Sequence, residues 1–379
     1  MTASSPHRVS SQANLNTNTT VAFLGPVNSY SHQATKTAFP EPEWRLEPTG
    51  TIKEVFDRVQ AGQAAYGVVP FENSTHGTVA FTLDNLADRA GEYAEIVVCD
   101  EVYLDVHHFL LGRRRDPLLR DPSPGSASAS ASAAPSAAAP SSPDPSSPPP
   151  ARDGSSSSSS SNSKGVPLAS LSHIRRVYSH PQAFGQTGAF VRRYLAQAET
   201  VEVSSTSRAA ELAAADPAGE SAAIASEWAG RGFGLDVLAR WVEDREDNTT
   251  RFFVLGKDGE AGEGGRAGGG EEGKGREDED DAAYSGARYK SLASFTVPHR
   301  QPGALADVLD CFRGRGLNLT SINSVPSLVE PFQYLFFVEF EGSRLDDPEG
   351  RVGGVLEDLN RVAERWRWLG SWRNRRSGR

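Results

Sequence analysis

The decapeptide VVPFENSTHG, residues 68–77, places a carboxylate, an amide and a hydroxyl directly after an apolar run. These groups belong to Glu72, Asn73 and Ser74. In open α/β sheets, ligands bind beyond the carboxyl ends of strands. A strand that ends before the proline and a helix that opens near Thr78 would therefore direct these side chains into a cleft. The alternative is that Asn73 or Ser74 only caps that helix.

Two further polar junctions follow expected strands. The string SHPQ, residues 179–182, puts a proline in the first turn of a helix and Ser179 or His180 in position to cap it. Unpaired N–H groups at such a helix start favour an anion. We interpret His180 as a capping residue rather than a base, because a catalytic histidine needs a partner that tunes it. The other junction is the loop GPVNSYS, residues 25–31.

A fourth polar stretch, DNTTRF, residues 247–252, runs into the apolar sequence FVLG. Arg251 offers a bidentate fork for a carboxylate, although Thr250 and Arg251 would also suit the start of an edge strand. Together the junctions predict a cleft of hydroxyls, amides and one arginine, suited to a small ligand that carries a carboxylate. A non-catalytic solute-binding module would present the same groups. The sequence has no established metal motif, nucleophile–base pair or phosphate-binding loop, so we expect no metal and no cofactor.

Alternating strands and helices must position these side chains. Between residues 20 and 256, apolar runs such as VAFLG and SAAIAS are followed by helical stretches such as SYSHQATKTAF and EWAGRGFGLDVLARW. This alternation predicts two α/β lobes with largely parallel sheets. Residues 288–376 instead follow the order strand, helix, strand, strand, helix, strand, which is the ferredoxin-like βαββαβ plan.

Three segments are predicted to lie outside any core. Residues 116–165 form a Ser/Ala/Pro tract with almost nothing to bury, typical of a disordered insertion. Residues 257–287 are Gly-rich and acidic, as in a flexible linker. Residues 1–19 show no amphipathic pattern and no secretory-signal plan, so we expect a disordered terminus.

Composition excludes several classes of function. The formal net charge of -10 argues against nucleic-acid binding, because phosphate contacts need a basic surface. No apolar run approaches the roughly 18 residues of a membrane span. The two cysteines, Cys99 and Cys311, lie far apart and form no disulfide framework or metal spacing. These features favour a reducing, cytoplasmic location.

Five strings in order resemble prephenate dehydratase with a C-terminal ACT regulatory domain. They are GPVNSYSHQAT, YGVVPFENSTHGTVAFTLDNL, VYSHPQAFGQ, AAIASEWAGRGFGLDVLARWVEDREDNTTRF and GALADVLDCFRGRGLNLTSINSVPS. The resemblance implies a two-lobed catalytic domain similar to periplasmic binding proteins at residues 20–256 and an ACT domain at 288–376. The implied reaction converts prephenate to phenylpyruvate with loss of water and carbon dioxide, without a cofactor.

The resemblance also assigns roles to residues. It implies that Thr250 donates a proton to the leaving hydroxyl. It implies substrate binding by Thr51, Glu72, Asn73, Ser74, Ser179, Gln186 and Arg251. It implies binding of the effector L-phenylalanine by Gly303, Ala304, Leu305, Asn323 and Ser324.

Two departures from the family pattern affect these expectations. The first loop reads Val-Asn-Ser at residues 27–29 where Gly-Thr or Gly-Ser is usual. The ACT motif Glu-Ser-Arg-Pro appears as Asn323-Ser324-Val325-Pro326, so we expect weaker phenylalanine binding. We expect a homodimer or homotetramer, with strand 332–340 offering an edge or face to a partner.

Two alternatives to this function share much of the pattern, and a third is not expected. Arogenate dehydratase differs only in an amino group on the substrate. A non-catalytic sensor with an ACT domain would share the architecture but would not need the proton donor. About 20 residues precede the first strand, too few for a fused chorismate mutase domain.

Overall fold

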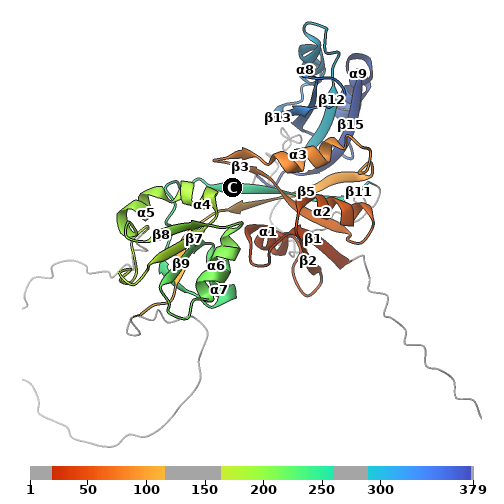
Figure 1. Ribbon diagram of the computed structural model, residues 1–379. Helices are drawn as coiled ribbons and strands as arrows, with labels where there is room; N and C mark the ends of the chain where they lie inside the picture. The colour runs from red at the N-terminus through yellow and green to blue at the C-terminus, as the bar shows by residue number, and fades with distance from the viewer. Residues whose placement is uncertain (1–18, 116–163, 259–288, 377–379) are drawn as a thin grey trace, which may run out of the picture.

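The computed structural model describes residues 19–115, 164–258 and 289–376 (Figure 1). Apart from a residue or two at their ends, the segments predicted as disordered or linker (1–19, 116–165 and 257–287) lie outside the described residues. The described chain forms two lobes and a C-terminal unit. Lobe 1 consists of residues 19–105 and 249–258, lobe 2 of residues 109–115 and 164–239, and the C-terminal unit of residues 289–376.

Lobe 1 is built on a mixed sheet with the strand order β2-β1-β3-β11-β5, and β4 pairs with β3. β1, β2 and β3 are parallel, whereas β11 runs antiparallel to both β3 and β5 because it returns from the other lobe. The strands are β1 (Thr20–Leu24), β2 (Arg45–Thr49), β3 (Tyr66–Asn73), β4 (Gly77–Thr78), β5 (Ile96–Asp105) and β11 (Thr249–Lys257). The helices are α1 (Tyr30–Ala38), α2 (Ile52–Gln60) and α3 (Ala80–Ala87).

Lobe 2 repeats this plan with the strand order β10-β6-β9-β7-β8. β9 is the fully buried run SAAIA, and the parallel strand β7 pairs with it and with β8. The strands are β6 (Phe109–Gly112), β7 (Arg176–Ser179), β8 (Glu199–Glu202), β9 (Ser221–Ala225) and β10 (Asp236–Ala239). The helices are α4 (Pro181–Gln186), α5 (Gly188–Tyr194), α6 (Thr206–Ala214) and α7 (Glu227–Phe233). The chain passes between the lobes at residues 106–108 and 240–248, which confirms the two-lobed α/β prediction.

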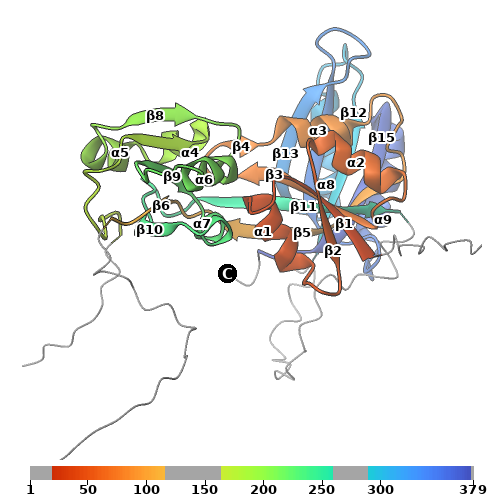
Figure 2. The same cartoon turned by 60° about the horizontal axis from the view of Figure 1, so that its bottom comes forward.

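The C-terminal unit has the predicted βαββαβ order and the sheet order β13-β14-β12-β15. Its elements are β12 (Tyr289–Thr296), α8 (Ala304–Gly314), β13 (Leu319–Pro326), β14 (Tyr334–Glu341), α9 (Arg351–Val362) and β15 (Arg365–Arg373). One face of this sheet packs against α8 and α9. The other face packs on lobe 1, and both Figures 1 and 2 show the unit beside that lobe.

A single hydrophobic core joins the C-terminal unit to lobe 1. It contains Val69, Phe71, Val98 and Phe253 from lobe 1 together with residues of the other unit, namely Leu292, Val325, Phe337, Leu369 and Trp372. The rings of Phe253 and Trp372 meet edge to face with 5.4 Å between centroids. At roughly 25 cal/mol per Å² of buried apolar surface, such a core holds the two units together as one body.

Two expectations about strand positions are corrected. β14 lies inside its sheet, paired with β12 and β13, so residues 332–340 do not supply an edge; β13 does. β3 does not end before Pro70 but continues to Asn73, whereas α3 begins at Ala80, near Thr78 as expected. The strand tolerates its proline because the β3–β11 register shifts there, and a bulge needs no N–H from the proline.

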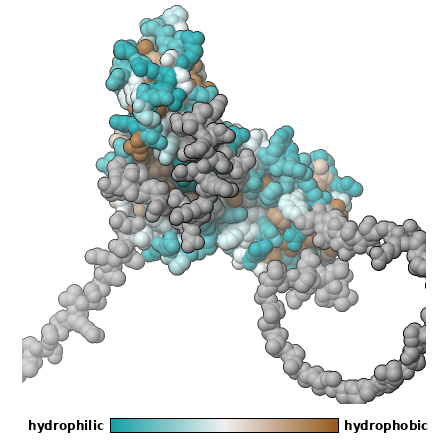
Figure 3. Space-filling view, turned by 180° about the vertical axis from the view of Figure 1, so that it is seen from behind, coloured by the Kyte–Doolittle hydropathy of each residue, from teal (hydrophilic) through white to brown (hydrophobic). Residues whose placement is uncertain are grey.

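Membrane-spanning helices are absent from the described residues. No helix among residues 19–115, 164–258 and 289–376 is long and apolar enough to cross a bilayer. On the face shown in Figure 3, the surface outside the grey regions is mostly hydrophilic, with small apolar areas.

Candidate active site between the lobes

The antiparallel pairing of β3 with β11 brings Asn73 opposite Thr250. Paired residues on neighbouring strands point to the same face of a sheet, and their side chains are bonded here. The Asn73 amide nitrogen Nδ2 donates to Thr250 Oγ1 at 2.9 Å and to Asn248 Oδ1 at 2.7 Å. Asn73 and Asn248 are both buried, while Thr250 is partly exposed.

The backbone fixes which way the Asn73 amide points. The N–H groups of Thr75 and His76 donate to Asn73 Oδ1 at 3.0 Å and 3.1 Å, so Nδ2 must face Thr250. Thr250 Oγ1 therefore accepts a hydrogen bond, and its own hydroxyl hydrogen has no acceptor within the described parts of the chain. By the same logic Asn248 Oδ1 accepts, and its buried Nδ2 is left without a described partner.

Gln186 extends this network across the cleft from lobe 2. Its Nε2 donates to Thr75 Oγ1 at 3.0 Å, and the Thr75 hydroxyl donates to Asn73 Oδ1 at 2.7 Å. Its Oε1 lies 2.7 Å from His108 Nε2, which must carry the hydrogen because a carbonyl oxygen only accepts. The hydrogen bonds thus run in one direction, from His108 through Gln186, Thr75 and Asn73 to Thr250.

His108 is held neutral in this network. It is 2% exposed, and burial lowers its pKa below the usual histidine value. The Tyr30 hydroxyl lies 3.2 Å from His108 Nδ1 and donates to the His107 carbonyl at 2.9 Å. Burial raises the pKa of Tyr30, and the nearby negative charge of Glu243 raises it further. The phenol therefore keeps its proton.

Sequence reasoning missed Tyr30 and His108 as members of the site. Tyr30 lies in the first polar loop, where the sequence only suggested that the loop faces the cleft. His108 follows β5 at the crossing between lobes. The doubled histidine at 107–108, directly after a strand, was the signal available.

The lobes also enclose a cavity of about 230 Å³ on the Tyr30 side of the cleft. Residues of both lobes and of the crossing line it: Tyr30, Gln33, Asp105, His107, Phe109, Ser226, Glu227, Trp228 and Arg231. Thr250 does not line this cavity. Nearby, Ser207 Oγ of lobe 2 donates to the Val27 carbonyl of lobe 1 at 2.8 Å, so the lobes touch.

Comparison with known proteins decides the family. A model of the prephenate dehydratase family matches residues 21–120 and 162–260. A bifunctional chorismate mutase/prephenate dehydratase of Neisseria gonorrhoeae is 30% identical over 353 residues, which are 93% of this chain and 74% of the relative. The chain belongs to the prephenate dehydratase family. Its activity is the carbon–oxygen lyase reaction of that family, the decarboxylating dehydration of prephenate.

Two further similarities cover nearly the whole chain. The prephenate dehydratase of Lactococcus lactis subsp. cremoris is 24% identical over 93% of this chain and 96% of its own length. A solved prephenate dehydratase from Arthrobacter aurescens, in complex with L-Phe, has a TM-score of 0.65 and 25% identity. The match covers 94% of this chain and 90% of that structure.

Three of the residues assigned to the prephenate dehydratase site have structural hydrogen bonds. Ser74 Oγ donates to the Asp247 carbonyl at 2.7 Å and accepts from Thr249 N–H at 2.9 Å, which ties the β3–β4 turn to β11. Ser179 is fully buried and donates to the Ile224 carbonyl at 2.7 Å. Thr51 caps α2 in a reciprocal capping box with Glu54.

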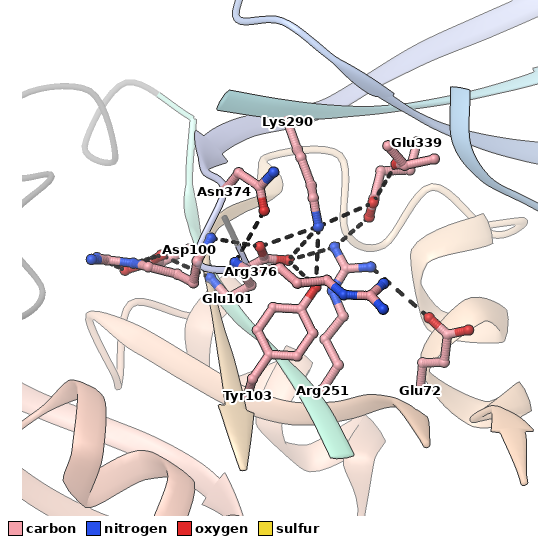
Figure 4. A network of polar contacts seen from close by, with 11 residues as sticks. Glu72, Asp100, Glu101, Tyr103, Arg251, Lys290, Glu339, Asn374 and Arg376 are labelled. Atoms are coloured by element: carbon pink, nitrogen blue, oxygen red, sulfur yellow. Dashed lines mark hydrogen bonds and ion pairs between the residues drawn. The ribbon is translucent and has the colours of Figure 1, made fainter. Parts of the chain in front are cut away.

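Arg251 and Glu72 lie on the other face of β11 and β3 from Thr250 and Asn73. Arg251 Nη2 is 2.6 Å from Glu101 and also pairs with Glu339 of the C-terminal unit, while Glu72 is 4.0 Å from Nη1 (Figure 4). The expectation that Arg251 binds a substrate carboxylate is therefore corrected. Successive residues of a strand alternate in direction, so Arg251 cannot point where Thr250 points.

The five residues expected to form the regulatory site are split between two places. Gly303, Ala304 and Leu305 line a cavity of about 210 Å³ together with side chains of β14. Asn323 does not line it; its Oδ1 accepts from Thr78 Oγ1 of lobe 1 at 2.8 Å. Ser324 also lies outside that lining, on the edge strand β13. Val325 is 7% exposed within the core shared with lobe 1, so an arginine there would disrupt that core.

Proposed function

We propose that Thr250 is the hydrogen-bond and proton donor of the dehydratase reaction. The carrying observation is that Asn73 donates to Thr250 Oγ1, which leaves the threonine hydrogen available for the substrate. In the reaction, the bond between the ring and its carboxylate breaks and its electron pair enters the ring. The ring C–O bond breaks, and the hydroxyl takes the Thr250 proton and leaves as water; Thr250 then regains a proton from solvent. Carbon dioxide leaves as a neutral molecule, and the ring becomes aromatic.

The remaining site residues orient rather than react. Asn73 fixes the direction of the Thr250 hydroxyl, and Gln186 joins the lobes over the bound substrate. The reaction of prephenate needs orientation and a proton donor more than a strong nucleophile. A neutral hydroxyl can therefore serve as the catalytic group.

The test is turnover of two candidate substrates by the purified protein. We expect prephenate to yield phenylpyruvate, with arogenate converted to phenylalanine more slowly. Faster conversion of arogenate would reverse the substrate assignment. Binding of prephenate without any product would favour the non-catalytic sensor instead.

We further propose that L-phenylalanine binds in the cavity beside Gly303 and regulates the enzyme. Gly303 has φ 85°, and the N–H groups at the start of α8 can receive a carboxylate. Apolar atoms of Leu305 and Phe336 also line the cavity and suit a phenyl ring. The bound L-Phe of the Arthrobacter aurescens structure supports this assignment. Inhibition of turnover by L-phenylalanine, but not by L-alanine, is the expected result.

The proposed assembly and location rest on two other features. The edge strand β13 and the loop that follows it expose Ile322, Leu328, Val329 and Phe332, which supports pairing of two C-terminal units in a homodimer or homotetramer. Both cysteines are free thiols, which supports a cytoplasmic enzyme. A monomer by light scattering at micromolar concentration would contradict the assembly.

A further inference from the structure

Four buried charged residues form an ion cluster between lobe 1 and the C-terminal unit (Figure 4). Lobe 1 contributes Arg251 and Glu101, and the C-terminal unit contributes Lys290 and Glu339. Their side chains are 6%, 0%, 5% and 3% exposed, respectively. Lys290 Nζ lies 3.3 Å from Glu101 and 3.5 Å from Glu339, and Arg251 pairs with both carboxylates.

Each charge in this ion cluster depends on the others. Burial opposes ionisation of Glu339, but Arg251 and Lys290 outweigh it and lower the pKa of that carboxyl. Burial likewise opposes the charge on Arg251, yet Glu339 and Glu101 raise its pKa. Two cations thus balance two carboxylates, and removing one partner leaves a buried charge uncompensated.

The guanidinium of Arg251 is also fixed by aromatic rings. Its central carbon lies 4.9 Å from the centroid of Phe253 and 6.0 Å from that of Trp372, which belongs to the C-terminal unit. Rings and carboxylates from both units therefore hold this side chain from several sides.

The ion cluster is one peptide bond away from the proposed proton donor. Arg251 follows Thr250 on β11, and the β3–β11 bulge begins directly after Arg251. A strand segment next to a bulge has fewer ladder hydrogen bonds to fix it. Holding the Arg251 side chain therefore fixes the backbone that sets Thr250 against Asn73.

The other end of the ion cluster lies on the strand that lines the cavity beside Gly303. Tyr334 and Phe336 of β14 line that cavity, and Glu339 follows on the same strand with its side chain toward lobe 1. A ligand that shifts β14 would move the Glu339 carboxylate against Arg251. One strand thus connects the proposed effector cavity with the residue next to Thr250.

We propose that Glu339 and Lys290 are positioning residues for Thr250, acting through Arg251, and that effector binding changes turnover by this route. The C-terminal unit thereby completes the support of the reaction centre without touching substrate. The inference rests on the proposed function, because Thr250 is taken as the donor and the Gly303 cavity as the effector site.

The test compares Glu339→Gln with Glu341→Gln in the full chain. Glu341 lies two residues further on β14 and makes no ion pair within the described residues, so it is a matched loss of one carboxylate. We expect Glu339→Gln to lower kcat roughly tenfold, the scale of a small misplacement of a catalytic group, with KM changed less than about twofold. We also expect the L-phenylalanine inhibition curve to shift to at least roughly tenfold higher concentration. Glu341→Gln should match the wild type in kcat, in KM and in its L-phenylalanine inhibition curve.

Hydrogen exchange and a second variant complete the test. Hydrogen exchange of the 249–253 backbone should rise in Glu339→Gln but not in Glu341→Gln, and this needs no substrate. If the glutamine variant does not fold, Arg251→Lys, which keeps the charge and loses the fork, should give the same split between kcat and KM. Wild-type kcat and an unchanged inhibition curve in a folded Glu339→Gln would overturn the proposal. Inactive wild-type protein would instead refute the proposed function, while the exchange comparison still decides whether Glu339 positions β11.

Discussion

Thr250 and Arg251 are neighbours on β11, yet their side chains contact different parts of the molecule. Thr250 accepts a hydrogen bond from Asn73 in the cleft between the lobes, whereas Arg251 pairs with Glu339 of the C-terminal unit. The period of two along a strand produces this division. The proposed proton donor and the contact with the C-terminal unit are thereby placed in consecutive residues.

Replacing Thr250 tests the donor directly. Thr250→Ala should lower kcat by roughly two to three powers of ten, the scale for losing a donor that acts in the transition state. KM should change little, and Thr250→Ser should retain most of the activity because the hydroxyl remains. Steady-state kinetics with prephenate measure both values, and near-normal kcat in the alanine variant would remove Thr250 from this role.

The orientation of the Thr250 hydroxyl gives a second prediction. Asn73→Asp keeps the shape of the side chain but replaces the Nδ2 donor with an acceptor, so the Thr250 hydrogen would turn toward the carboxylate. We expect kcat to fall by about two powers of ten. Asn85→Asp also removes an amide donor, one that is half-buried and bonds the Phe81 carbonyl within α3; it is the matched control and should leave kcat unchanged. Equal activity of the two variants would show that the direction of this hydrogen bond is irrelevant.

The sequence was sufficient for the architecture because strands and helices alternate with clear periods. The βαββαβ unit and both lobes follow from these patterns. The resemblance to the family placed Asn73, Gln186 and Thr250 in one site, and they do lie close together. That Thr250 and Arg251 face opposite sides follows from their adjacency on a strand, but the sequence did not show that the Arg251 side would be covered by the C-terminal unit, because Glu339 lies 88 residues away. His108 and the ion cluster were missed because their partners are 78 to 189 residues away, and no local pattern marks them.

Docking of the C-terminal unit depends on one glycine. Gly370 of β15 has φ 123°, and a Cβ added there would lie 2.0 Å from the Val98 carbonyl oxygen of lobe 1. Gly370→Ala should therefore separate the two units locally. A loss of about 1–3 kcal/mol in the free energy of unfolding would lower the thermal midpoint by several degrees. Gly314→Ala in α8, where nothing lies within 4 Å of the added atom, should be neutral or stabilising. Calorimetry of both variants checks this, and equal midpoints would contradict the contact.

Acid should weaken the same docking through Glu339. Its pKa is lowered in the folded state, so its contribution is present above the unfolded value near 4.5 and is lost as pH falls through the folded pKa. The groups that face it are Arg251 and Lys290; Glu101 completes the ion cluster, and the Tyr103 hydroxyl accepts from Lys290 beside it. Below about pH 4.5, the free energy of unfolding of the wild-type protein should fall more steeply with decreasing pH than the free energy of unfolding of Glu339→Gln. Parallel pH profiles from denaturant titrations would argue against this contribution.

The position of β11 in the sheet order β2-β1-β3-β11-β5 has a consequence for the order of synthesis. β3 and β5 are made early, but the strand that lies between them is complete only at Lys257, after all of lobe 2. Until then the nascent chain carries two strand edges without their common neighbour. Lobe 1 therefore cannot complete its sheet on the ribosome before lobe 2 has been translated, and a gene split inside the 116–163 segment would yield an amino-terminal fragment that must acquire β11 from the other piece.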